Sequence, residues 1–142
     1  MEEKLTKVQQ ERQADQYSPL VLAYMGDVVF EIFVREQLVK ESNMPVNKLH
    51  HAASSLVKAQ AQSRMIQVLE EELTEKEASI YRRGRNAKSN TSAKNASILD
   101  YRRATGFEAL LGYLYLNKEN DRLLELMEKA VRSERKNERK KF

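Results

Sequence analysis

Two long stretches without a polar face constrain the fold of this chain more than any other feature. Residues 20–39, LVLAYMGDVVFEIFVREQLV, are apolar on nearly every side of a helix until Glu31. The second half of the stretch 98–116, FEALLGYLYL, has the same character. A helix that is hydrophobic all round is expected to be buried against several neighbours. We therefore predict two interior helices around which the rest of the chain packs.

Shorter signals along the chain indicate further helices. Ser18 followed by Pro19 marks the start of the first interior helix, since serine caps helices and proline fits the first helical position. Thr74 and Glu77 have the spacing of a capping box, which predicts a helix that opens there and runs into the sequence YRRGRNAK. Two more helices are predicted, at 48–71 with Asn47 as its cap and at 121–136 with Asn120 as its cap.

The chain shows no sign of a β-sheet. No segment alternates apolar and polar residues for long enough to form a strand, and the polar segment 89–97, SNTSAKNAS, is typical of a loop. The 4 Gly and 2 Pro are few for a fold of many short strands, and 142 residues fit one domain. We predict an all-α helical domain at 18–130, a polar N-terminal extension at 1–17 and a basic C-terminal tail at 131–142.

Composition excludes several classes of protein. The chain has no cysteine, which excludes a disulfide scaffold, a thiolate metal site and a cysteine nucleophile. The N-terminal sequence MEEKLTKVQQERQADQ lacks the apolar core of a signal peptide, and no apolar run reaches the ~20 residues of a membrane span. No P-loop or GxGxxG sequence is present. We expect a cytoplasmic protein with no membrane and no small-molecule cofactor among its partners.

The positive charge of the chain is concentrated in two places. Residues 82–103 carry a net charge of +6 and residues 131–142 a net charge of +4, although the whole chain carries only +4. An acidic body with a basic stripe indicates a polyanionic partner that binds at a defined place. A solvated helix face is the alternative. For residues 131–142, a solvated face explains the charge as well as a polyanionic partner does. For residues 82–103, it is the weaker explanation.

Each interior helix contains one acid where an apolar residue would pack better, Asp27 in AYMGDVVF and Glu108 in TGFEALLG. A buried carboxylate without a partner is costly, so it must be paired, protonated or bound to a cation. Small residues flank both acids, which would let the two helices approach closely and bring the carboxylates together. From the residues alone, an internal salt bridge or a helix-cap hydrogen bond explains the acids as well as a shared metal site does.

The residue types favour a hard cation if a metal is bound. Oxygen ligands without Cys and without a His cluster are typical of Mg²⁺ or Mn²⁺ sites. His50 and His51 are adjacent, so on a helix their side chains point about 100° apart and do not share a metal. We interpret both histidines as surface residues.

Three motifs in order along the chain resemble the ribonuclease III family. Residues 22–29, LAYMGDVV, resemble its signature helix, and residues 107–116, FEALLGYLYL, resemble its second acidic helix. Residues 83–89, RGRNAKS, followed by Lys94-Asn95 and Tyr101-Arg102, are more specifically similar to the Mini-III ribonucleases, short bacterial members without a double-stranded-RNA-binding domain. The resemblance covers residues 18–128, and we expect no further domain after residue 128.

The resemblance implies a helical endonuclease domain that dimerises through its signature helices, so that two symmetric sites face the strands of an RNA duplex. It implies a metal-dependent endoribonuclease that cleaves double-stranded RNA and matures the 23S ribosomal RNA precursor in the bacterial cytoplasm. Asp27 and Glu108 would be the catalytic residues and the ligands of Mg²⁺, with Mn²⁺ as an alternative. RNA-binding residues are expected at Arg82, Arg83, Arg85, Asn86, Lys88, Lys94, Asn95 and Arg102.

The chain departs from the full ribonuclease III pattern at two ligand positions. That pattern has four acids, and the extra two lie four residues before the signature Asp and three before the Glu. This chain has Ala23 and Thr105 there, so a four-carboxylate site for two metals does not follow. Glu31 is either a substitute ligand or, the better interpretation, an ion-pair partner of Arg35.

Two other functions are compatible with the sequence. A catalytically idle RNA-binding module on the same fold is the main alternative, because two of the four acids are missing. A helical interaction protein with an incidental basic segment is the third interpretation. Cleavage and binding of duplex RNA separate the three.

Overall fold

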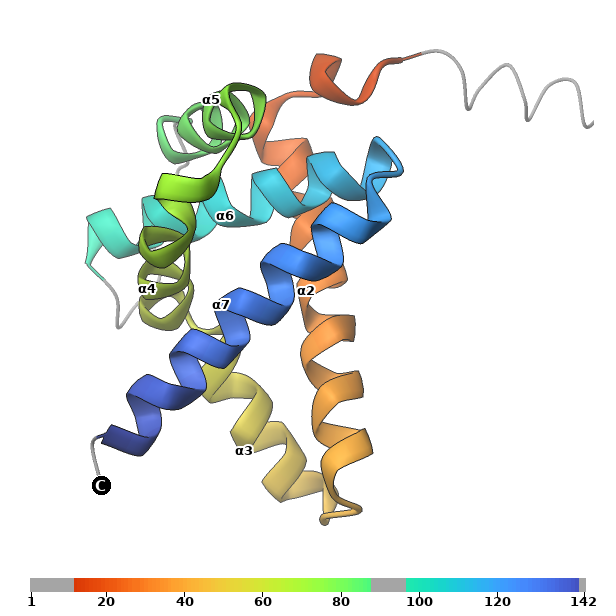
Figure 1. The fold of residues 1–142 in the computed structure, drawn as a ribbon, viewed down its shortest axis with the longest axis vertical. Coiled ribbons are helices and arrows are strands. Elements are labelled where there is room, and N and C mark those ends of the chain that lie inside the picture. The colour runs from red at the N-terminus through yellow and green to blue at the C-terminus, as the bar shows by residue number, and fades with distance from the viewer. Residues whose placement is uncertain (1–11, 88–96, 141–142) are drawn as a thin grey trace, which may run out of the picture.

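The computed structural model describes residues 12–87 and 97–140, and in these ranges the chain is helical without a strand (Figure 1). The all-α prediction is confirmed. Most of the predicted loop at 89–97 lies outside the described residues. In chain order the elements are the 3-10 turn η1 (Ala14–Gln16), α2 (Pro19–Glu41), α3 (Val46–Val57), α4 (Ala59–Leu69), the 3-10 turn η2 (Glu70–Glu72), α5 (Glu75–Arg85), α6 (Ile98–Leu116) and α7 (Asn120–Lys140).

Several helix ends follow the local signals in the sequence. At the start of α2 the hydroxyl of Ser18 accepts a hydrogen bond from the amide of Val21, with Pro19 in the first turn. Thr74 and Glu77 form the predicted capping box at α5, each side chain bonding to the backbone amide of the other residue. The predicted bounds of α6 agree with its observed bounds.

The predicted helix at 48–71 is wrong in two respects. It is two helices, because Lys58 has extended backbone angles (φ −64°, ψ 155°) that end α3 and precede α4. Helix α3 also begins one residue before Asn47, which therefore lies in its first turn and does not cap it. The two helices pack against different neighbours, α3 against α2 and α4 against α6 and α7. The step of five residues between buried Leu56 and buried Ala61 already departs from helical spacing.

Helix α6 is the centre of the fold. In Figure 1 it runs across the upper half of the molecule, and α2, α4, α5 and α7 all pack against it. From Ala104 to Leu114 every residue is buried except Glu108, which is half-buried. Phe107 meets Phe30 of α2 edge to face, with ring centroids 5.4 Å apart. The predicted interior position of this helix is confirmed. None of the described helices is long and apolar enough to cross a membrane.

Two glycines allow α2 and α6 to cross with their backbones in contact. A Cβ atom at Gly26 would lie 1.7 Å from the carbonyl oxygen of Glu108, and a Cβ atom at Gly112 would lie 1.9 Å from the carbonyl oxygen of Leu22. Even a methyl group does not fit at either position without moving backbone. The small residues beside the two acids therefore have the effect predicted from the sequence, which is a close approach of the two helices.

The prediction that α2 is covered by neighbours all round is wrong within this single chain. Phe30 and Val34 are fully buried, but Tyr24, Val28 and Ile32 are 77%, 53% and 61% exposed. These three residues are four apart, so they form one apolar stripe along the outside of the helix. We call them the outer stripe of α2.

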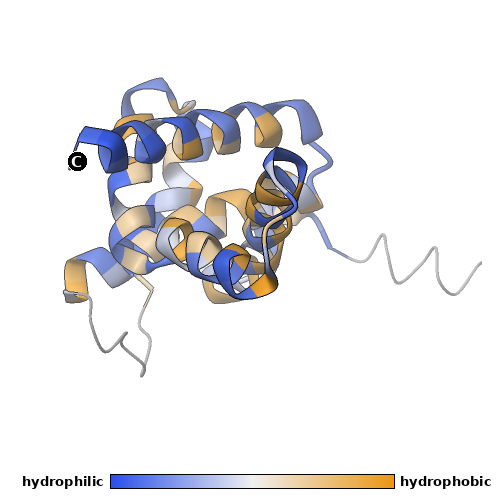
Figure 2. Ribbon diagram, turned by 90° about the horizontal axis from the view of Figure 1, so that it is seen from below, coloured by the Kyte–Doolittle hydropathy of each residue, from blue (hydrophilic) through white to orange (hydrophobic). Residues whose placement is uncertain are grey.

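Helix α7 packs through one face, and Figure 2 shows hydrophobic and hydrophilic residues alternating along it. Its inner face includes Leu126 and Ala130, which are fully buried. The described part of the basic segment 131–142 continues this helix as far as Lys140. Three ion pairs join α7 to neighbouring helices. Glu134 of α7 pairs with Arg64 of α4, and Arg122 of α7 pairs with Glu77 of α5. Arg135 of α7 pairs with Glu41 at the end of α2.

Replacing Gly112 by alanine should destabilise the fold, because the added methyl group meets the carbonyl oxygen of Leu22. Alanine is favoured over glycine inside a helix by about 1 kcal/mol, so propensity alone would raise stability. Overpacking at the crossing should outweigh this gain and lower the free energy of unfolding by about 2–3 kcal/mol. Urea unfolding followed by circular dichroism measures the change. Equal or higher stability would contradict the backbone contact.

Candidate active site

The helix crossing brings Asp27 and Glu108 together. Gly26 lies against the backbone of Glu108, so the next residue along α2, Asp27, lies beside that acid. The two carboxyl groups are within hydrogen-bonding reach of each other. Two residues far apart in the sequence thus form one acidic site, which we call the acid pair.

The acid pair is less buried than the sequence suggested. Asp27 is exposed, which corrects the expectation of an interior carboxylate, and Glu108 is half-buried. Burial and the neighbouring charge of Asp27 raise the pKa of the Glu108 carboxyl to about 8. Both effects disfavour the charged form, burial by removing water and Asp27 by repulsion. An acid whose pKa is shifted toward neutrality marks a candidate functional site.

The salt-bridge interpretation of the acid pair does not hold within the described part of the chain. The ion pairs found there join other acids to Lys and Arg, and neither Asp27 nor Glu108 takes part in one. Both acids also lie inside their helices rather than at a cap. Among the residues that the structure describes, no cationic side chain therefore forms an ion pair with either carboxylate.

Gln62 of α4 is a third side chain at this site. Its Nε2 atom donates to Glu108 Oε2 at 3.4 Å and to the carbonyl oxygen of Val57 at 2.8 Å. The hydrogen bond favours the charged form of Glu108 and so opposes the rise of its pKa. The sequence interpretation missed Gln62, since it placed this residue inside one continuous helix and gave it no role. A polar residue at a buried position of α4 was the available signal.

The positions of the two missing acids supply no substitute ligand. Ala23 is buried, and the hydroxyl of Thr105 donates to the carbonyl oxygen of Tyr101 at 3.0 Å. Glu31 pairs with Arg35, whose Nε atom lies 3.2 Å from Glu31 Oε2, in line with the ion-pair interpretation. In the described ranges, no group of three or more His, Cys, Asp and Glu side chains could hold a metal.

A hydrated divalent cation nevertheless fits the acid pair. A cation between the carboxylates would offset both their repulsion and the cost of burying Glu108. Mg²⁺ keeps several waters in proteins and is commonly held by only one or two carboxylates together with substrate phosphates. The buried Oε1 atom of Gln62 also lacks a hydrogen-bond partner among the described residues, and buried polar atoms are normally paired with protein or water. The donor set therefore suits Mg²⁺ that retains much of its water.

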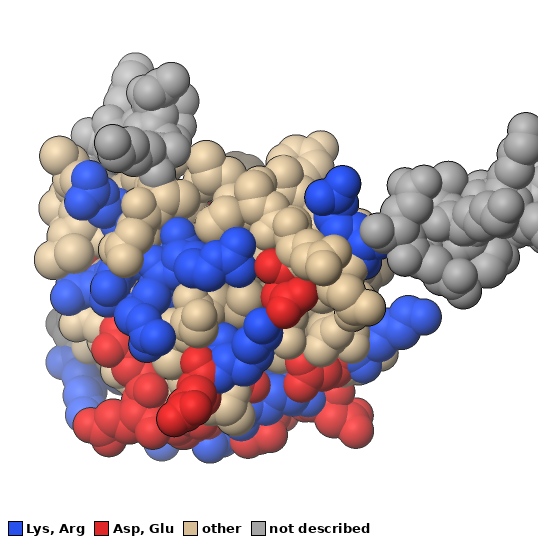
Figure 3. All heavy atoms as spheres, turned by 90° about the horizontal axis from the view of Figure 1, so that it is seen from above, with Lys and Arg blue, Asp and Glu red and all other residues tan. Residues whose placement is uncertain are grey.

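The described members of the predicted RNA-binding set lie where α5 ends and α6 begins, on either side of residues 88–96. Arg82, Arg83 and Asn86 are exposed at the end of α5, and Arg102 is exposed near the start of α6. Figure 3 looks down on the side of the molecule where α5 lies and shows Lys and Arg side chains gathered there. Lys88, Lys94 and Asn95 of the predicted set lie outside the described residues.

Two of these arginines also contact other parts of the chain. Arg83 donates to the carbonyl oxygen of Asp15 at 3.2 Å. Arg85 is half-buried, and its guanidinium lies 5.6 Å from the ring centre of Tyr81, a cation–π distance. Arg82 and Arg102 have more exposed side chains than Arg85 and are better placed to reach a phosphate.

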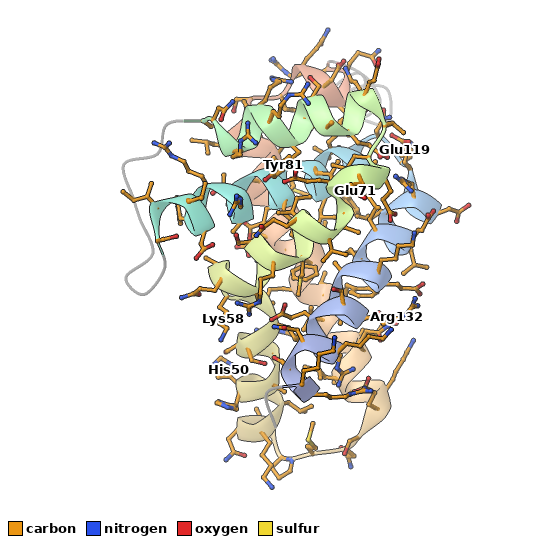
Figure 4. All side chains as sticks on the ribbon, turned by 60° about the vertical axis from the view of Figure 1, so that its left-hand side comes forward. His50, Lys58, Glu71, Tyr81, Glu119 and Arg132 are labelled. Atoms are coloured by element: carbon orange, nitrogen blue, oxygen red, sulfur yellow. The ribbon has the colours of Figure 1, made fainter. Side chains whose placement is uncertain are left out.

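The histidines lie on α3, a helix that carries neither acid of the pair. His50 and His51 are in α3 and both are exposed, as expected of surface residues. Figure 4 shows His50 on α3, Lys58 at the break between α3 and α4, and Tyr81 in a separate part of the molecule between α5 and α6.

The sequence of this helical domain matches a known protein family. The family model described as "Ribonuclease III domain" matches residues 20–119, which is more than half of the chain. The matched range contains both helices of the acid pair. The chain therefore belongs to the ribonuclease III family, and it is an endoribonuclease.

Similar proteins place the chain in the Mini-III branch of that family, as the sequence motifs predicted. A protein named "Mini-ribonuclease 3" from Clostridium tetani is 54% identical over 117 residues, which are 82% of this chain and 78% of that protein. Another of the same name, from Enterococcus faecalis, is 46% identical over 85% of this chain and 93% of its own length. A crystal structure of a Fusobacterium nucleatum protein superposes with a TM-score of 0.77 at 26% identity, covering 84% of this chain and 95% of that one.

Replacing Glu108 by glutamine should stabilise the metal-free protein at alkaline pH. The carboxyl pKa is raised from 4.5 to about 8 on folding, so the folded state holds its proton more tightly than the unfolded state does. Stability therefore falls as the pH rises from 4.5 toward 8, and the full loss is present above that range. At about pH 9, glutamine should recover on the order of 1–3 kcal/mol, and the gain should shrink toward about pH 5.

Urea unfolding of parent and variant in the presence of a chelator, at both pH values, measures this gain. Glu31→Gln is the matched control, since it removes an acid from a surface ion pair and should show no comparable pH dependence. A gain from Glu108→Gln that is the same at both pH values would contradict the raised pKa.

Proposed function

We propose that this endoribonuclease cleaves double-stranded RNA with Mg²⁺ held by the acid pair, and that Mn²⁺ can substitute. The observation that carries the proposal is the placement of two unpaired carboxylates, Asp27 and Glu108, side by side at the crossing of α2 and α6. Each would offer oxygen to the cation, and water and an RNA phosphate oxygen would complete its shell. Enzymes of the ribonuclease III family act on double-stranded RNA, which supports the substrate class.

In the proposed reaction, the cation and the side chains of the acid pair have different roles. When bound, Mg²⁺ would lower the pKa of a water that attacks phosphorus and would stabilise the charge on the leaving 3′ oxygen. Asp27 lies at the exposed edge of the site, where it can meet a phosphate group, whereas Glu108 lies deeper and is held by Gln62. Asp27 and Glu108 would thus hold the cation, and RNA would reach it past exposed Asp27.

The basic residues around 88–96 would hold the RNA backbone. We propose that Arg82 and Arg102 contact phosphates, together with Arg83, Arg85, Asn86, Lys88, Lys94 and Asn95. Contacts to phosphates position a duplex but do not read its sequence, and A-form RNA is recognised mainly by shape and by 2′-hydroxyl groups. The polar segment 89–97, most of which lies outside the described residues, is proposed to lie along a groove of the duplex.

A second copy of the chain would cover the outer stripe of α2. Tyr24, Val28 and Ile32 form a continuous apolar surface of a kind that often marks a protein interface. Asp27 is on the same helix between two of these residues, so a two-fold interface there would place two acid pairs close to its edge. We propose a homodimer, in which each site faces one strand of the duplex.

The cellular substrate that we propose is a ribosomal RNA precursor, the 23S precursor, in the cytoplasm. This proposal rests on the resemblance to Mini-III ribonucleases. The idle RNA-binding module is the alternative, and the observation that favours it is the lack of any described acid beyond the pair at this site. A nuclease with two carboxylates and a binding module with the same fold differ in whether they cut duplex RNA.

Asp27→Asn and Glu108→Gln should each lower the cleavage rate of a duplex RNA in Mg²⁺ by on the order of 10³-fold, because each removes a ligand charge from the cation. Both variants should still bind the duplex when cleavage is blocked with Ca²⁺. Glu31→Gln, one turn along α2, is the control and should keep the parental rate, since Glu31 pairs with Arg35.

Gel electrophoresis of a labelled duplex measures cutting, and fluorescence anisotropy measures binding. Equal cutting by Asp27→Asn and the parent would overturn the role of the acid pair. A parent that binds duplex RNA and does not cut it would establish the idle module. A parent that does neither would favour the helical interaction protein.

Reversing charge at the ends of α5 and α6 should weaken binding without unfolding the protein. In Arg82→Glu/Arg102→Glu, two exposed phosphate contacts are lost, so the dissociation constant for duplex RNA should rise about tenfold or more at moderate salt. The slope of log affinity against log salt should fall by about 2. Lys48→Glu/Lys118→Glu makes the same change in net charge at exposed positions elsewhere and should have a much smaller effect. Equal effects of the two double variants would contradict the proposed RNA surface.

Ile32→Glu should convert the proposed dimer into monomers, because it places a charge in the outer stripe, where the partner would bury it. Sedimentation velocity measures the association. Val68→Glu on α4 is the control, since Val68 is an equally exposed apolar residue on another helix. A parent that is monomeric at tens of micromolar, or a variant that remains dimeric, would contradict an interface on the outer stripe.

A further inference from the structure

Gln62 is a polar side chain that a third helix, α4, contributes beside the acid pair. It is 3% exposed, so both ends of its amide are removed from solvent. Its helix packs directly against α6, which carries Glu108. A buried amide at such a place must form hydrogen bonds, since leaving one of its groups unpaired costs free energy.

The hydrogen bonds of Gln62 fix the orientation of its amide. Nε2 lies 2.8 Å from the carbonyl oxygen of Val57 and 3.4 Å from Glu108 Oε2. Both of these partners are acceptors when Glu108 is ionised, so the NH₂ group of the amide must face them and the oxygen must point elsewhere. One side chain thereby uses its two N–H groups for two separate acceptors.

The contact with Val57 explains why Gln62 is held in place. Val57 is the last residue of α3, and the carbonyl groups of a last helical turn lack a partner within their own helix. The chain turns into an extended conformation at Lys58, and Gln62, in the first turn of α4, satisfies the carbonyl of Val57. The break between the two helices is thus what brings an amide to Glu108.

The remaining atom of the amide is unsatisfied. Gln62 Oε1 is buried and has no hydrogen-bond partner within the described part of the chain. Such an atom is normally paired with protein or with an ordered water, and an exception at a site needs an explanation. A water held beside the acid pair would supply the missing donor.

We infer that Gln62 is a positioning residue for the cation site. By donating to one carboxylate oxygen of Glu108, Gln62 orients that carboxylate. Glu108 would then be held ready to bind the cation, and Gln62 Oε1 would be able to accept a hydrogen bond from a water at this site. Because an amide is neutral, Gln62 orients the ligand without adding charge. Positions 23 and 105 have no acid in this chain. Gln62 of α4, a neutral group, takes over part of the positioning that acids there would have provided.

The inference rests on the proposed cation site, and the test separates the two. Gln62→Met keeps an unbranched side chain of similar size and removes both N–H donors. Gln67→Met is the matched control, because Gln67 lies on the same helix and its Nε2 also donates to a backbone carbonyl, that of Ser63 at 3.0 Å, without contacting an acid. Loss of an outer partner of a metal ligand typically weakens metal affinity by 10- to 100-fold.

Mn²⁺ binding to the RNA-free protein, measured by electron paramagnetic resonance, should weaken by about tenfold or more in Gln62→Met and remain at the parental value in Gln67→Met. The Mg²⁺ concentration for half-maximal cleavage should rise in parallel, with duplex binding in Ca²⁺ unchanged. A Gln62→Met variant that melts at lower temperature but binds Mn²⁺ like the parent would overturn the inference, since that is the result of a purely structural glutamine.

A second measurement uses the unaltered protein, in case Gln62→Met does not fold. In ¹⁵N–¹H spectra, the side-chain NH₂ signals of Gln62 should shift on titration with Mg²⁺, and those of Gln67 should not. Absence of a shift at Gln62 while the protein binds Mg²⁺ would refute the inference and leave the cation site standing. Failure of the parent to bind Mn²⁺ or Mg²⁺, with or without RNA, would instead refute the proposed function.

Discussion

The backbone contact between α2 and α6 is the constraint on which the rest of the structure depends. Each of the two glycines, Gly26 and Gly112, faces a carbonyl group of the other helix rather than a side chain. A clash with a flexible side chain can be relieved by a new rotamer, whereas a clash with backbone moves a whole helix. The crossing therefore sets the position of the acid pair, because Asp27 follows one glycine and Glu108 lies one turn before the other. Helices α4, α5 and α7 then cover the sides of α6 that α2 leaves open.

The acid pair and the buried acids Glu77 and Glu134 have different electrostatic surroundings. Glu134, at 2% exposed, is bonded to Arg64, and Glu77 is bonded to Arg122, whose hydrogen bond lowers the pKa of that carboxyl. The chain thus provides an arginine for its structural acids, which tie α7 to its neighbours. For Glu108 it provides a neutral amide and a second carboxylate, and the pKa is raised. The described part of the chain pairs buried Glu77 and Glu134 with arginines but leaves half-buried Glu108 beside exposed Asp27, and a cation would offset the charge of these two acids.

Helix α2 carries two kinds of surface that meet at the acid pair. Its inner side holds Gly26 and Phe30 against α6, and its outer stripe is exposed. Asp27 lies between them, at the edge of the packed interior. If a second chain covers the outer stripe, as we propose, the acid pair becomes a site at the border of two subunits. In the proposed function, the basic ends of α5 and α6 would supply the positive charge that holds RNA at such a site.

By itself, the sequence determined the helices at both long apolar stretches, the capping box at Thr74, and the presence of one acid and neighbouring small residues in each apolar stretch. Each depends on residue type and on spacing within a few turns, which can be read locally. Tertiary structure alone decided the break at Lys58, the exposure of Asp27 and the contact between Gln62 and Glu108. The sequence of an apolar helix does not show whether its own chain or a second chain covers it. The hydrogen-bond partner of a buried glutamine likewise depends on how the helices pack. Those features depend on which neighbour each helix face meets, and that choice is made by packing across the whole chain.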